Sequence, residues 1–189
     1  VYWAFSDSTL AITGSGDMYD YNSNSAPWQL FKDSIKVITI SDSITRIGKY
    51  AFYNIKGITS ITIPLNLKSV GSSAFEECTG LRTLVWNAIR MDNESNLGYL
   101  NASYIQNVEF GNQVERIPNS LCSGMNLLMQ ITIPQSVKEI GDNAFYECRN
   151  LSQVVFNEGL QNIGNYVFYG CSSLTSIVMP PTLETLGGN

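Results

Sequence analysis

Apolar residues recur along this chain at one long, fixed interval. Segments with the pattern aliphatic-x-x-aliphatic-x-apolar, such as "ITSITIP", "LMQITIP" and "LTSIVMP", start at Ile35, Ile58, Leu81, Ile105, Leu128, Leu151 and Leu174. Successive starts are 23 residues apart, except for 24 between Leu81 and Ile105. A fixed period of this size predicts a solenoid of stacked coils, because a single coil is too small to bury its own apolar face.

Each coil is expected to begin with a short β-strand. The recurring segments are rich in β-branched residues, and several end at a proline, as at Pro64, Pro134 and Pro180. Because proline cannot donate a ladder hydrogen bond, we expect the strand to end there. Equivalent strands stacked on one another would form a parallel β-sheet along one side of the solenoid.

The second half of each coil contains a bulky aliphatic residue followed by glycine, as in Ile47-Gly48, Ile140-Gly141 and Ile163-Gly164. A short segment containing Ala-Phe follows several of these pairs, as in "IGDNAFYEC". Glycine tolerates positive φ, so we expect the chain to turn at this residue. A short helical or irregular segment would then return the chain to the next strand.

The whole pattern, "LTSITIP-xx-V-xx-IG-xx-AF-xx-C-xx-L", closely resembles the leucine-rich repeat of BspA-like surface proteins, over roughly residues 35–187. The resemblance implies a leucine-rich-repeat solenoid, a right-handed β/α superhelix of about seven coils with its parallel sheet on the concave side. It also implies a surface-exposed, extracellular protein that binds host or cell-surface proteins. The signal or anchor segment would lie outside this chain.

Two regions depart from the repeat. Residues 1–34 contain "YWAFSDSTLAITGSG", whose alternating apolar residues on either side of a turn predict a β-hairpin that caps the solenoid of residues 35–189. The coil at residues 81–104 is irregular, because residues 87–104 lack both the glycine turn and the Ala-Phe segment. No C-terminal cap is evident in "TLETLGGN". We therefore expect the native protein to continue further or its last coil to be poorly ordered.

Composition argues against several functional classes. The chain has no histidine, which removes Ser-His-Asp and Cys-His catalysis and the usual zinc ligands. Its net charge of −5 repels nucleic acid and anionic membrane surfaces, and no apolar run reaches the roughly 18 residues that span a bilayer. Asp92, Glu94 and Asn96 alternate as in a calcium loop, but the glycine and final glutamate of such a loop are missing. We expect no enzyme activity, no cofactor, no metal, no nucleic-acid partner and no membrane insertion of this segment.

Cys148, in "GDNAFYECRN", follows a glutamate and two aromatic residues and so raises the question of a reactive thiol. The repeat places it in one column with Ile55, Cys78, Met125 and Cys171. A position that accepts Ile, Met and Cys predicts a buried apolar side chain. Side chains in one column point the same way, which disfavours a disulfide between neighbouring coils.

Function is therefore expected on the surface, in binding. The candidate partner-contact residues are Arg90, Met91, Tyr99, Tyr104, Arg82, Glu109 and Met129. The first four lie in the irregular segment 87–104 and have side chains of types enriched in interfaces; the alternative is that this segment is merely a tolerated irregular coil. The expected ligand is a protein or, alternatively, a glycan. The competing interpretation of the whole chain is a passive stalk or spacer that presents another domain.

Overall fold

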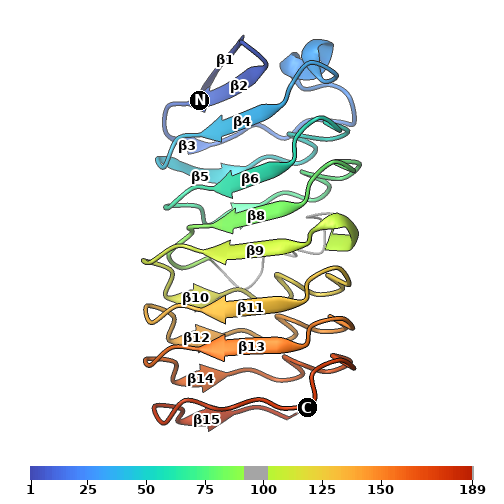
Figure 1. Cartoon of the computed structure of the whole chain (residues 1–189). Helices are drawn as coiled ribbons and strands as arrows, with labels where there is room; N and C mark the ends of the chain where they lie inside the picture. Colours follow the sequence, from blue (N-terminus) through green and yellow to red (C-terminus); the bar gives the residue numbers. More distant parts are fainter. Residues whose placement is uncertain (92–101, 189) are drawn as a thin grey trace.

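The computed structural model describes residues 1–91 and 102–188, which form a stack of β-coils (Figure 1). The chain advances one coil at a time from the N-terminal to the C-terminal end, and this confirms the solenoid predicted from the repeat. The only helices among the described residues are two short 3₁₀ segments, η1 (Pro27–Phe31) and η2 (Ala102–Tyr104). The returns between strands are therefore turns and irregular segments, and none of the described helices has the length and apolar character needed to cross a membrane.

Six of the seven predicted strands form the principal row along one side of the stack, whereas the segment that starts at Leu174 is not a strand. They are β4 (Val37–Ile40), β6 (Ser60–Ile63), β8 (Thr83–Trp86), β9 (Asn107–Phe110), β11 (Gln130–Ile133) and β13 (Gln153–Phe156). Paired neighbours are parallel and in the register of the repeat, so that Ser60 lies opposite Thr83, and Gln130 opposite Gln153. Side chains alternate between core and surface along each strand: in β11, Ile131 and Ile133 are buried.

The principal row is not one continuous ladder. Hydrogen bonds join β6 to β8 and β8 to β9, and they join β11 to β13. Within the described part of the chain, no ladder joins β4 to β6 or β9 to β11. The second of these interruptions lies under the candidate site described below.

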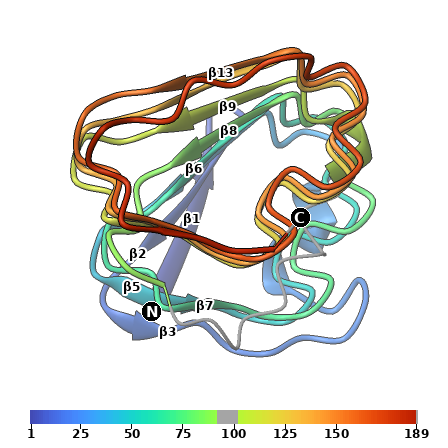
Figure 2. The same ribbon diagram turned by 90° about the horizontal axis from the view of Figure 1, so that it is seen from below.

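A second row of strands, which the repeat pattern did not predict, lies on the other side of the stack. It comprises β3 (Gly16–Asp17), β5 (Ile44–Ile47), β7 (Ser69–Val70), β10 (Arg116–Ile117), β12 (Glu139–Ile140), β14 (Asn162–Ile163) and β15 (Thr185–Leu186). Figure 2, a view along the axis, shows β6, β8, β9 and β13 on one side of the core and β3, β5 and β7 on the other. Most of these strands include the aliphatic residue that precedes the recurring glycine.

The N-terminal segment takes part in both rows. Strands β1 (Tyr2–Ser6) and β2 (Thr9–Thr13) form an antiparallel hairpin, and β2 pairs in parallel with β4. Strand β3 pairs with β5. The indole nitrogen of the buried Trp28 donates a hydrogen bond to the carbonyl of Ala51, 2.7 Å away in the next coil. We propose that residues 1–34 act as the cap of the solenoid, since they cover its first coil while continuing its hydrogen bonding.

The prediction that the recurring glycines adopt positive φ was wrong. Gly48 and Gly141 do not have positive φ; that conformation occurs two and six residues after Gly141, at Asn143 (57°) and Glu147 (58°). The glycines are needed for space, because a Cβ at Gly48 would overlap the carbonyl of Tyr19, and one at Gly141 would lie 2.8 Å from the backbone nitrogen of Asn119. The absence of a side chain lets successive coils approach closely.

Aspartate and asparagine side chains connect the coils at one corner of the stack. The backbone N–H of Asp142 donates to Oδ1 of Asn119 at 3.0 Å, and that of Asn165 donates to Oδ1 of Asp142 at 2.6 Å. The N–H of Gly188 continues the series by donating to Oδ1 of Asn165 at 3.0 Å. This corner ladder, formed by the side chains of residues 119, 142 and 165, satisfies backbone donors that the two rows of strands leave unpaired.

Candidate functional site

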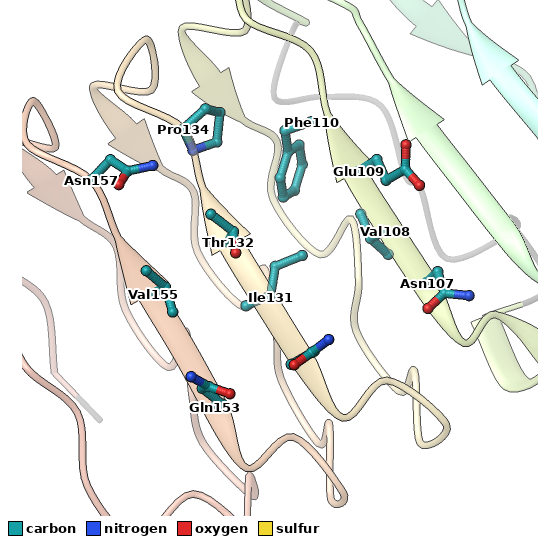
Figure 3. Close-up of a pocket in the computed structure, with 11 residues that line it drawn as sticks. Asn107, Val108, Glu109, Phe110, Ile131, Thr132, Pro134, Gln153, Val155 and Asn157 are labelled. Carbon is teal, nitrogen blue, oxygen red and sulfur yellow. The ribbon is translucent and has the colours of Figure 1, made fainter.

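The exposed face of β9, β11 and β13 carries a shallow groove (Figure 3). Its volume is about 500 Å³, and a second hollow of about 620 Å³ adjoins it at the start of the same strands. The residues that line one or both are Gln106, Asn107, Val108, Glu109, Phe110, Leu127, Met129, Gln130, Ile131, Thr132, Pro134, Ser152, Gln153, Val155 and Asn157. We call this set the groove face.

Strand alternation explains which side chains reach this face. The third residue of each repeat points outward and gives a column of carboxamides, Asn107, Gln130 and Gln153, all of them exposed. Two positions further along, the fifth residue gives a second outward column that includes Glu109 and Val155. Paired parallel strands lie about 4.8 Å apart. Members of a column on paired strands, such as Gln130 and Gln153, are therefore one strand spacing apart.

The floor of the groove lies at the interruption between β9 and β11. Val108 and Ile131, which are buried, line it from the two strands. Each strand has a ladder partner on its other side, β8 for β9 and β13 for β11. The facing backbone edges of β9 and β11 therefore make no ladder hydrogen bonds with each other. The groove combines an apolar floor, polar walls and backbone edges that have no ladder partner among the described strands.

The chemistry of the groove face suits binding better than catalysis. Glu109 is the only ionisable residue among the described residues that line it. Glycoside hydrolysis uses two carboxyl groups that flank the reacting bond, and the described residues of this face supply one. The side chains of Gln130, Gln153 and Asn157 make no hydrogen bonds with other described residues, so their donors and acceptors face solvent.

Two predicted contact residues lie on the groove face. Met129 is 65% exposed and lines the second hollow, and Glu109 is exposed and lines the first. Arg82 and Tyr104 form a pair elsewhere, with the guanidinium 5.7 Å from the ring centroid. Arg82 is also held by hydrogen bonds to the carbonyls of Thr79 and Leu81. Arg82 and Tyr104 do not line either hollow.

The remaining candidates lie in the irregular segment. Arg90 is exposed, with Nη1 3.7 Å from a carboxylate oxygen of Glu115. Met91 is only 1% exposed, so its assignment as a surface contact is corrected: it packs in the core. Tyr99 and the calcium-loop-like residues Asp92, Glu94 and Asn96 lie outside the described residues.

Cys148 is a packing residue in the structure. All four cysteines are free and buried. The Cys148 thiol donates to the carbonyl of Cys122 at 3.0 Å, and the Cys78 thiol donates to the carbonyl of Phe52 at 3.1 Å. Burial raises the pKa of the Cys78 thiol to about 12 and also raises the pKa of Cys122. Cys148 also has a raised pKa, because of the adjacent Cys171 thiol and burial. Nucleophilic chemistry at neutral pH needs the opposite shift.

Sequence reasoning missed the carboxamides that dominate the groove face. Neutral amides form neither acid pairs, cation clusters nor aromatic cages, so they do not match the side-chain patterns that usually mark a functional site. The available signal was the run Asn107, Gln130, Gln153, which places an amide at the same repeat position in three consecutive coils. Asn157, just after β13, adds another amide to the same face.

Comparison with known proteins agrees with the repeat register. The family model of the BspA type leucine rich repeat region matches residues 29–128 and 94–189, and it includes six copies of the repeat. No curated protein matches the sequence. No enzyme family is found.

A solved structure from Bacteroides ovatus shares the fold. A leucine-rich repeat protein from Bacteroides ovatus ATCC 8483 is 22% identical, with a TM-score of 0.56 over 75% of this chain and 42% of its own. This chain therefore spans less than half of that protein's length. A leucine rich cell surface protein from Faecalibacterium prausnitzii A2-165 is 20% identical, with a TM-score of 0.35 over 76% of this chain and 53% of its own.

Proposed function

Since the chain belongs to the family of BspA-type leucine-rich repeat proteins, we propose that it is a non-catalytic interaction module that binds a host or cell-surface protein. The groove face would be its contact surface. The observation that carries this proposal is the groove itself, in which amides without hydrogen bonds to other described residues and exposed apolar side chains surround a hollow over three adjacent strands.

The position of the groove within the fold supports the same proposal. Recognition by a repeat protein uses an extended face to which each coil contributes a few side chains. The groove face draws on β9, β11 and β13 in this way. A passive spacer needs no such hollow, because stacked coils alone would give it length.

The proposed location is extracellular or at the cell surface. The support for it is membership in a repeat family named for a surface protein. Burial of all four free thiols is compatible with an oxidising compartment, because buried thiols are protected from oxidation.

The test is binding of the whole chain to a panel of immobilised extracellular-matrix and cell-surface glycoproteins, measured by surface plasmon resonance at physiological salt. A Met129→Glu variant places a charge in the groove, and we expect it to weaken binding at least about tenfold, as for the loss of a central interface residue. Val37→Glu is the matched control, because Val37 is 47% exposed on β4, away from the groove.

Two results would contradict the proposal. If no member of the panel binds the wild-type chain, the spacer interpretation gains. If a member binds and Val37→Glu weakens it as much as Met129→Glu does, the groove face is not the contact surface.

A further inference from the structure

The groove face carries an arrangement of amides that fits one class of ligand. Gln130 and Gln153 are direct partners in the ladder between β11 and β13, and Asn107 occupies the same repeat position on β9. A primary amide offers both donors and an acceptor in one plane. Vicinal hydroxyl groups of a sugar also donate and accept, so each amide matches a pair of them.

The charge of the face restricts the ligand further. Of the residues that the structure describes, Glu109 is the only ionisable group that lines the groove, and none of the lining residues is a lysine or an arginine. The chain as a whole carries a net charge of −5. Sulfated, sialylated or uronic-acid-containing glycans would be repelled and would find no cation to pair with. The complementary ligand is neutral.

Apolar side chains beside the amides provide the other half of sugar recognition. Met129 is 65% exposed and Val155 is 39% exposed, and both border the amide column. The C–H faces of a sugar ring pack on such surfaces while its hydroxyl groups meet the amides. Figure 3 shows Val155 and Gln153 together on β13, facing the groove.

The spacing of the coils separates a glycan from an extended peptide. Strands β11 and β13 are paired and so lie about 4.8 Å apart, whereas alternate residues of an extended peptide repeat every roughly 6.6 Å. A peptide running along the solenoid axis would therefore not match the spacing of Gln130 and Gln153. One sugar unit of an extended β-linked chain is close to this strand spacing in length, so such a chain can present hydroxyl groups to both amides in turn.

We propose that the groove face binds a neutral, extended, β-linked oligosaccharide, with successive sugar units on the paired strands β11 and β13 and the oligosaccharide continuing toward β9. The inference rests on the proposed function and names the part of the cell-surface partner that is recognised, its glycan. Asn107, Gln130 and Gln153 are the residues that contact the sugar hydroxyl groups.

The experiment is isothermal titration calorimetry of the whole chain with four hexasaccharides at physiological salt. Cellohexaose and chitohexaose are the neutral, extended, β-linked probes, and we expect both to bind. Maltohexaose is neutral but α-linked and curved, and hexagalacturonate is anionic. We expect each of these two comparators to bind at least tenfold more weakly than cellohexaose.

Paired variants locate the contact. The double substitution Gln130→Ala with Gln153→Ala removes two neighbouring amides and should weaken cellohexaose binding about tenfold or more, through lost hydrogen bonds. Ser60→Ala with Thr83→Ala is the matched control, because these residues are ladder partners at the same repeat position on β6 and β8. It should leave the affinity unchanged. Equal thermal unfolding midpoints would show that both variants fold like the wild type.

The outcomes separate this inference from the function on which it rests. The inference is overturned if neither β-linked probe binds, if a comparator binds as tightly, or if the two double variants behave alike. If the probes fail but a panel protein binds and Met129→Glu weakens that binding, the partner is recognised through its polypeptide and the proposed function stands. If the probes and the panel both fail, both proposals fall.

Discussion

Single thiol groups in this chain act as core packing. Cys148 fills the position that Ile55 and Met125 fill in other coils, and all three side chains are fully buried. The thiols of Cys78, Cys148 and Cys171 each donate a hydrogen bond to the carbonyl of a residue 26 positions earlier in the sequence. The residue beside Cys148 has a backbone role, since Glu147 adopts a φ of 58° where the coil turns.

Thiol reactivity tests this assignment. The thiolate is the reactive form, and a pKa raised to about 12, as for Cys78, leaves it almost unpopulated at about pH 8. We expect Ellman's reagent at that pH to modify at most one thiol in the native chain and all four after unfolding in guanidinium chloride. Rapid modification of two or more thiols in the native chain would show that the cysteine column is accessible.

The recurring glycines matter because they have no side chain, which lets neighbouring coils pack closely. We expect Gly141→Ala to reduce the free energy of unfolding by about 1–3 kcal/mol, because the added Cβ would lie 2.8 Å from the backbone nitrogen of Asn119. The control is Gly188→Ala, whose Cβ would have its nearest neighbour at 3.9 Å. Urea denaturation measures both. Equal effects of the two substitutions would argue against close coil stacking at Gly141.

The contacts that join neighbouring coils include two rows of strands and the corner ladder of residues 119, 142 and 165. The strand rows use backbone pairing alone and tolerate varied side chains. The corner ladder depends on side-chain oxygens, so its stability is tied to particular residues. Asp20 makes an equivalent contact near the N-terminus: the Lys49 N–H donates to its Oδ1 at 2.7 Å, and this hydrogen bond, with the nearby Arg46, lowers the pKa of its carboxyl.

Removing one rung of the corner ladder tests its contribution. Asp142→Ala leaves the backbone N–H of Asn165 without its acceptor at 2.6 Å, and we expect a loss of about 1–2 kcal/mol in the free energy of unfolding. Asp33→Ala is the control, because Asp33 is exposed and its carboxylate makes no hydrogen bond with the described residues. A loss within error of that control would mean that water replaces the side chain at no cost.

At the scale of the whole molecule, the 23-residue period of the sequence predicted most of the fold. It predicted the six strands of the principal row, the inward columns and the packing role of Cys148, because burial against the next coil repeats with the sequence. It did not predict the second row of strands, whose members are mostly two residues long and have no alternating pattern of their own. The conformation of the recurring glycines was also mistaken, since the space available at Gly141 depends on the neighbouring coil.

The candidate site was only partly predictable. Glu109 and Met129 were singled out and do line the groove face, but Met91 proved to be buried. The groove arises from an interruption in the hydrogen bonding between β9 and β11, and a repeat with one register gives no signal for it. Exposed columns can be read from the sequence; hollows between strands depend on tertiary structure.

The most direct test of the account asks where a partner touches the stack. A photoreactive p-benzoylphenylalanine is placed at Val155, on the groove face, or at Val37, on β4; these side chains are 39% and 47% exposed. Each protein is irradiated with the panel glycoprotein that binds the wild type. We predict crosslinking from position 155 and little from position 37. Equal crosslinking from both positions, or crosslinking only from position 37, would contradict recognition through the groove face.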